Sequence, residues 1–138
     1  MQRTDEAERA VLGTVLETSG KVLDELDLNG DDFYDPRRGD LYEAMRETWS
    51  RGIPVEAFTL SETRPDEAAD LFALSSEAVP VSSVPYYADV VKRDGLRRRL
   101  AAVGARLAQV EPGMDSAAVA DEARRLVDEA IGGVGVGL

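Results

Sequence analysis

Apolar residues recur at three- and four-residue spacing along most of the chain, which is the spacing of one face of an α-helix. The predicted helices cover residues 5–16, 21–28, 36–51 and 66–74, with a short helix opening at residue 59 and two longer ones at 84–110 and 116–131. The pattern therefore predicts an all-α fold in which about five short helices form a head.

Capping signals mark the boundaries of several of these helices. Thr4 is predicted to cap the first helix, and residues 29–30 (Asn-Gly) are predicted to end the second. Residues 35–36 (Asp-Pro) are a strong helix start, because aspartate caps well and proline fits the first helical position. Residues 59–62 have the threonine-to-glutamate spacing of a capping box, and Asp115 is predicted to cap the last helix.

Gly13 lies inside the first predicted helix. A glycine in a helix interior costs about 1 kcal/mol relative to alanine. A close approach by another helix is the usual reason to keep one there, so the sequence predicts a tight helix contact at Gly13.

The last third of the chain has a different pattern, in which apolar residues alternate four and three positions apart on two helices joined by a Pro-Gly turn. Such a pair predicts an antiparallel helical hairpin. We expect a head at residues 1–82, the hairpin at 83–131, and a glycine-rich tail or linker at 132–138. The apolar hairpin positions favour association with a second copy, and packing against the chain's own head is the alternative. The predicted self-association residues are Leu96, Leu100, Val103, Leu107, Val119, Leu126 and Ile131.

Composition narrows the classes of function. The 138 residues suit one domain, and the formal net charge of −11 disfavours strong binding to nucleic acid. No apolar run approaches the roughly 18 residues needed to cross a bilayer, and the amino terminus lacks the pattern of a signal peptide. We therefore expect a cytoplasmic protein without membrane contact.

The residues that most often carry catalysis or hold metal ions are missing. The chain has no cysteine and no histidine, so we expect no metal site. The Gly20-Lys21 pair lacks the glycine and the serine or threonine of a phosphate-binding loop, so we predict no ATP site and no cofactor. With 27 acidic residues, a carboxylate-dependent enzyme remains an alternative.

One cationic cluster stands out near the start of the hairpin, formed by Lys92, Arg93, Arg97, Arg98 and Arg99. Three interpretations are open for it: a solvated helix surface paired to acidic neighbours, a contact to an acidic face of a partner protein, or a phosphate contact. The overall negative charge makes the phosphate contact the least favoured of the three.

Five strings, in order along the chain, resemble the N-terminal domain of DnaB-type replicative DNA helicases. Residues 5–13 read DEAERAVLG, and residues 32–37 read DFYDPR, followed by LYEAM at 41–45. Residues 51–55 read RGIPV, and residues 87–100 read YADVVKRDGLRRRL.

The resemblance implies a non-catalytic helical head and hairpin that belong to the collar of a hexameric helicase ring. It implies self-association, and docking of primase or a helicase loader during DNA replication. It implies no catalytic residue here, because catalysis in that family lies in a motor domain outside this sequence. A stand-alone protein that mimics the collar and regulates a helicase in trans is the second hypothesis, and a nucleic-acid-binding module is a further one.

Overall fold

The computed structural model describes residues 2–132, so the predicted tail at 132–138 lies outside the described residues except for Gly132. The described chain forms six α-helices joined by loops and four 3-10 helices, and the predicted all-α fold is confirmed. The α-helices are α1 (Gln2–Glu17), α2 (Pro36–Ser50), α3 (Ala57–Ser61), α4 (Ala68–Ser75), α5 (Val84–Leu107) and α6 (Ser116–Ile131). The 3-10 helices are η1 (Lys21–Glu25), η2 (Gly30–Asp32), η3 (Pro65–Glu67) and η4 (Val81–Ser83).

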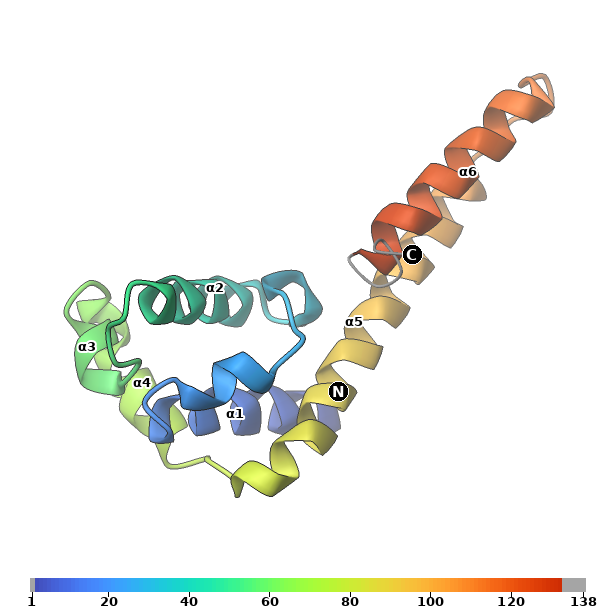
Figure 1. Ribbon diagram of the computed structural model, residues 1–138. Helices are drawn as coiled ribbons and strands as arrows, with labels where there is room; N and C mark the ends of the chain where they lie inside the picture. Colours follow the sequence, from blue (N-terminus) through green and yellow to red (C-terminus); the bar gives the residue numbers. More distant parts are fainter. Residues whose placement is uncertain (1, 133–138) are drawn as a thin grey trace. The chain divides into compact units, whose positions relative to one another are not determined.

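The chain divides into two compact units, one ending at Asp94 and the other beginning at Gly95, so that α5 contributes to both. In the first unit, α1 and α2 lie one above the other, and α3 and α4 lie together at one end (Figure 1). Their apolar faces, with the start of α5, bury one continuous core. Its largest fully buried apolar side chains are Leu12, Tyr42, Met45 and Leu71, with Val11, Val15, Val55, Val84 and Val91 around them.

The tight contact predicted at Gly13 is confirmed. A Cβ placed on this residue would lie 2.3 Å from the carbonyl oxygen of Leu74 and 2.9 Å from the amide nitrogen of Ala78. Both atoms belong to the backbone, which cannot rotate away as a side chain can. Gly13 is therefore the position at which α1 meets the end of α4.

Gly20 ends the turn after α1 in the left-handed conformation, with φ of 96°. Its amide donates to the carbonyl of Val15 at 2.8 Å, and the carbonyl of neighbouring Ser19 accepts from the amide of Val55 at 3.0 Å. A Cβ on Gly20 would lie 2.7 Å from the Trp49 ring. The turn therefore ties α1 to the segment before α3.

The prediction that Thr4 caps the first helix is wrong, because α1 already begins at Gln2. The Thr4 hydroxyl donates instead to the carboxylate of Asp94 on α5. Acidic Asp5 still lies in the first turn, where the helix dipole favours negative charge.

The predicted second helix is shorter and tighter than expected. Residues 21–25 form the 3-10 helix η1, and the chain is already extended at Leu26. Asn29 is not a helix end but the residue before η2, where its amide donates to the Asp32 carboxylate at 2.8 Å. The buried Asp32 explains the difference, since its carboxylate holds this turn in place.

The capping box predicted from Thr59 is also misplaced by three residues. Glu56 precedes α3, and its amide donates to the Thr59 hydroxyl at 3.0 Å, so Thr59 lies inside the helix rather than at its start. The other two signals are confirmed. Asp35 accepts from the amide of Arg37 at 3.0 Å, and Asp115 accepts from the amide of Ala118 at 3.1 Å.

Tyr42 packs in the core against the Phe33 ring, with 5.1 Å between ring centroids. Burial raises the pKa of its hydroxyl from the usual 10 to about 12. The folded protein therefore keeps a proton that the unfolded chain releases near pH 10. The contribution of Tyr42 to stability is fully present below that pH and is lost as the pH rises toward 12.

We expect the free energy of unfolding to fall by about 2 kcal/mol over this range for that reason. Urea unfolding of the wild type and of Tyr42→Phe across the alkaline range measures it. The Tyr42→Phe protein should lose most of this decline, and parallel curves for the two proteins would contradict the assignment.

In the second unit, α6 runs antiparallel to the last turns of α5 and forms a helical hairpin (Figure 1). The Arg99 guanidinium donates from Nε to the carbonyl oxygen of Ala130 at 2.7 Å, and Arg106 lies 3.8 Å from Glu122. Among the described residues of this unit only Gly95, Leu126 and Ala130 are buried. The hairpin thus has very little core of its own.

Candidate interaction surface

The predicted self-association residues lie on the hairpin and differ in exposure. Leu126 is buried between the two helices, and Leu100 is 39% exposed. The remaining five positions are half-buried: Leu96, Val103, Leu107, Val119 and Ile131. Leu126 therefore packs within the hairpin, while Leu100 presents an apolar side chain to solvent. Association through this surface stays a prediction.

The cationic cluster on α5 has partners within the chain. The Lys92 ammonium lies 3.2 Å from the Asp27 carboxylate and also donates to its carbonyl oxygen at 2.9 Å. Arg93 pairs with Asp89 at 2.8 Å, one turn earlier on the same helix. These contacts offset the charges of Lys92 and Arg93. A role of Lys92, Arg93, Arg97, Arg98 and Arg99 in partner contact stays a prediction.

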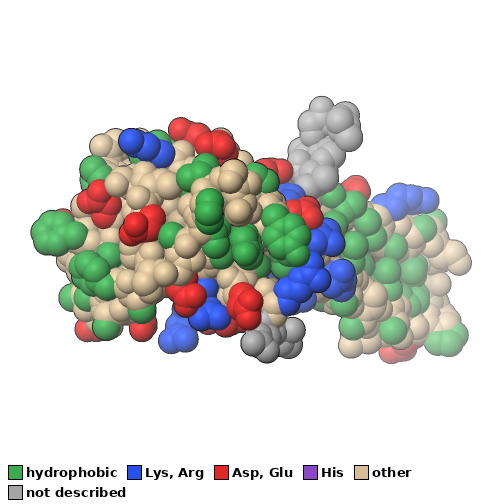
Figure 2. Space-filling model, turned by 90° about the horizontal axis from the view of Figure 1, so that it is seen from below, with side chains coloured by type: hydrophobic (Ala, Val, Ile, Leu, Met, Phe, Trp, Pro, Cys, Tyr) green, Lys and Arg blue, Asp and Glu red, His purple; other side chains and the backbone are tan. Residues whose placement is uncertain are grey.

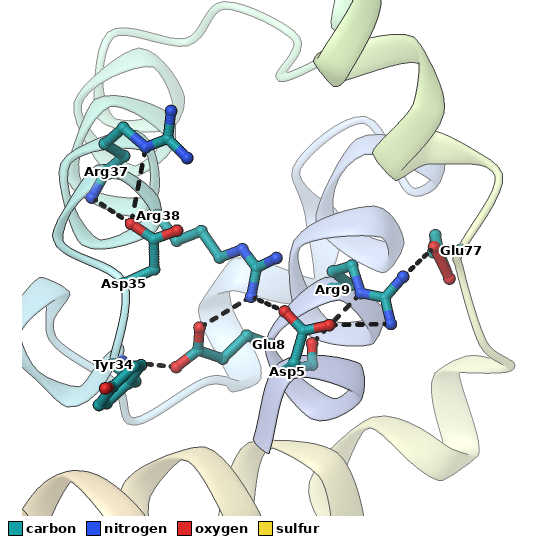
Figure 3. Close-up of polar contacts among 8 residues, drawn as sticks. All are labelled: Asp5, Glu8, Arg9, Tyr34, Asp35, Arg37, Arg38 and Glu77. Atoms are coloured by element: carbon teal, nitrogen blue, oxygen red, sulfur yellow. Dashed lines mark hydrogen bonds and ion pairs between the residues drawn. The ribbon is translucent and has the colours of Figure 1, made fainter. Parts of the chain in front are cut away.

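A buried carboxylate forms the centre of a polar network that the sequence analysis did not single out. Glu8 is only 1% exposed, although it is charged. Its Oε2 accepts from the Tyr34 amide at 2.5 Å, and its Oε1 lies 3.1 Å from Nη1 of Arg38 (Figure 3). Glu8 thereby fixes the loop before α2 against α1.

Arg38 connects this carboxylate to a second one. Its Nη1 lies 2.7 Å from Asp5, which in turn lies 3.0 Å from Arg9 (Figure 3). Arg9 continues the chain of charges to Glu77 at 2.8 Å. Burial disfavours the charged guanidinium, but the hydrogen bonds and charges of Asp5 and Glu8 outweigh it and raise the pKa of Arg38.

The network borders an open cleft on the first unit. The residues that line this cleft are Thr4, Asp5, Glu8, Tyr34, Asp35, Pro36 and Arg38. Two of its carboxylates, Asp5 and Glu8, are already bound to arginine, so the contacts fasten α1, the loop and α2 together. The network is therefore best explained as a structural clamp rather than as an acid–base pair.

A signal for this clamp was present in the sequence. Glu8 lies three and four residues before Val11 and Leu12, on the apolar face of the predicted helix. A carboxylate on a buried face needs a cation or amide donors nearby. The partner could not be predicted, because Arg38 is 30 residues away in sequence.

In residues 2–132, no cluster of three or more metal-binding side chains lies together. None of the helices in the same range combines the length and hydropathy that a bilayer crossing requires. The described residues therefore form an all-helical fold, with a clamped core unit and a hairpin that has little core of its own.

Comparison with known proteins gives the family. The profile of the DnaB-like helicase N-terminal domain matches residues 1–93, and the chain belongs to this family. It is similar to the replicative DNA helicase DnaB of Mycobacterium leprae, with 32% identity over 131 residues that cover 86% of this chain and 22% of the relative. It is also similar to the replicative DNA helicase DnaC of Bacillus subtilis, with 31% identity over 91% of this chain and 28% of the relative.

A solved structure supports the same fold over nearly the whole chain. The crystal structure of the N-terminal domain of DnaB helicase from Mycobacterium tuberculosis has 30% sequence identity and a TM-score of 0.73. The match covers 88% of this chain and 94% of that one. The chain spans about a quarter of the length of the curated relatives, and it matches the N-terminal, non-catalytic part of an ATP-dependent helicase.

Proposed function

We propose that this chain acts as the non-catalytic collar domain of a replicative DNA helicase. In this role it associates with further copies through the hairpin and docks primase or a helicase loader during DNA replication. Family membership supports the setting, since the relatives are replicative DNA helicases. The acidic charge of −11 is consistent with docking of proteins rather than DNA.

The observation that carries the proposal is the apolar surface that the hairpin leaves uncovered. Two helices that bury only Leu126 and Ala130 between them gain little stability from their own contact. Leu100 remains exposed, with half-buried Leu96, Val103 and Leu107 on the same helix. Pairing with a second hairpin would remove this apolar area from water, as a symmetric interface does.

Leu100→Asp is expected to abolish self-association, because it places a charge at an apolar interface. Leu100 already contacts solvent in the single chain, so its replacement leaves the helices folded. Light scattering over a concentration series measures the mass, and circular dichroism measures the helix content.

Ala105→Asp is the matched control. Ala105 is exposed on the same helix, about 140° around the helix axis from Leu100, and the substitution adds the same charge. We expect the Ala105→Asp protein to assemble as the wild type does. A wild type that stays monomeric at high concentration, or an unchanged mass in Leu100→Asp, would contradict the proposed interface.

A further inference from the structure

Two phenylalanines lie on the surface at the end of the first unit, where α3 packs against α4. Phe58 is 66% exposed and Phe72 is 57% exposed. Phe58 directly follows buried Ala57, and Phe72 directly follows buried Leu71. The inner faces of α3 and α4 therefore already pack in the core, and the phenylalanines lie outside it.

The outer face of α4 carries no charged side chain. Ala69, Phe72 and Ala73 are exposed on one side of the helix, and exposed Ser76 follows the last residue of α4 on the same side. A shallow hollow lies beside Phe72, lined by Glu17, Phe72, Ser75, Ser76 and Ala78. Two exposed phenylalanines beside such a face make it a candidate contact surface.

Carboxylates surround this apolar face. Residues 56–77 contain six acidic side chains and a single basic one, Arg64, which pairs with Glu67 at 2.8 Å. Glu62, Asp66 and Asp70 are exposed, and no ion pair holds them within the described part of the chain. Figure 2 shows hydrophobic and acidic side chains next to one another at this end of the unit.

The exposed carboxylates narrow the kinds of molecule that could bind over the two phenylalanines. Nucleic acid and anionic membranes are repelled by unpaired carboxylates. A second copy that met the same face symmetrically would bring two sets of these carboxylates, Glu62, Asp66 and Asp70, close together. A segment with positive charge beside apolar residues fits both the phenylalanines and the carboxylates.

We propose that the outer face of α3 and α4 docks a basic amphipathic helix of another protein. The apolar stripe of that helix contacts Phe58 and Phe72, and its lysines and arginines pair with Glu62, Asp66 and Asp70. This is the binding mode in which an amphipathic helix lies along an apolar surface. The inference rests on the proposed docking role and assigns a location and a partner chemistry to it.

Fluorescence anisotropy with a labelled synthetic peptide tests the proposal on the full chain. The probe is a helical peptide of about 18 residues, with leucine along one face and lysine on the other. We expect it to bind, and we expect a peptide with glutamate in place of every lysine not to bind. Equal binding of both peptides would overturn the charge argument.

Phe72→Ser is expected to weaken binding of the basic peptide by about tenfold or more, as loss of an aromatic anchor does. Tyr86→Ser is the control, because Tyr86 is 60% exposed in the same unit but lies on α5. An equal loss of affinity in both variants would show that the peptide does not bind specifically at the α3–α4 face, and would overturn the proposal.

Asp66→Asn combined with Asp70→Asn is expected to weaken binding by about three- to tenfold at low salt. Glu25→Gln combined with Glu111→Gln removes two exposed charges elsewhere and should leave affinity unchanged. An equal effect of the two pairs would mean that the peptide responds only to net charge, which would overturn the proposed site.

The mass of the Phe72→Ser protein separates this inference from the proposed self-association. We expect its mass to equal that of the wild type in light scattering. A lower mass would assign the face to a second copy and overturn the inference. A monomeric wild type that still binds the basic peptide would contradict the hairpin interface and leave the α3–α4 site standing.

Discussion

Replacing Glu8 with alanine is expected to lower the free energy of unfolding of the first unit by about 3 kcal/mol. The substitution removes the acceptor of the Tyr34 amide and one of the two carboxylates that hold Arg38. It leaves the guanidinium partly buried with Asp5 alone, and opens a space in α1 at a site that is 1% exposed. Urea unfolding followed by circular dichroism measures the change.

Two further variants separate the clamp from a general effect of mutation. Glu8→Gln keeps an acceptor for Tyr34 but loses the charge toward Arg38, so an intermediate loss is expected. Glu47→Ala removes an exposed carboxylate from α2 and should change stability by less than about 0.5 kcal/mol. A Glu8→Ala protein as stable as the Glu47→Ala protein would show that the network contributes nothing.

Gly13→Ala is expected to destabilise the protein by about 2 kcal/mol, although alanine is the better helix former. The new methyl group would lie 2.3 Å from the Leu74 carbonyl oxygen, so α1 and α4 must separate to admit it. The first unit then loses packing across the whole contact. Thermal and urea unfolding of the variant against the wild type measure the loss.

Gly104→Ala provides the opposite expectation within the same chain. Gly104 lies inside α5, and a Cβ there would have no neighbour within 4 Å. Only the helix propensity then changes, so the free energy of unfolding of the hairpin should rise by up to about 1 kcal/mol. If Gly13→Ala proved stabilising like Gly104→Ala, the close approach of α4 to α1 would be refuted.

Local sequence signals predicted helix boundaries correctly where the interacting groups lie within a few residues of one another. Asp35 and Asp115 begin α2 and α6 as expected, because the capping side chain and the amide that it binds are two or three residues apart. Gly13 was also correctly interpreted. The prediction needed only the cost of a glycine in a helix, and not the identity of its neighbour.

The predictions failed where a distant group changes the local choice. Thr4 has the sequence of a cap, but its hydroxyl binds Asp94, which is 90 residues away. Asn29 and Gly30 have the sequence of a helix end, but the Asn29 amide donates to the carboxylate of buried Asp32 and forms a turn instead. Residues 21–25 form a 3-10 helix that places both Val22 and Leu23 in the core within a short connection.

The candidate surfaces were predictable only in part. The hairpin and its apolar seam follow from spacing, but spacing does not reveal that Leu126 turns inward while Leu100 is left in water. Phe58 and Phe72 were missed for the same reason. A phenylalanine next to a buried leucine is assigned to the core by default, and only the fold shows that α4 presents its other side.

On the proposed self-association, the small core of the hairpin would link its folding to the protein concentration. Two helices that bury so little apolar area are expected to open readily, and their backbone amides would then exchange with solvent. If a second hairpin covers the same surface, a chain whose hairpin has opened can no longer pair. Dilution then shifts the equilibrium from paired, closed hairpins toward open ones. Amide exchange along α6 would then slow as protein concentration rises, while exchange in the core around Met45 and Leu12 would stay constant. On the proposed collar role, assembly of the ring would also complete the folding of its subunits.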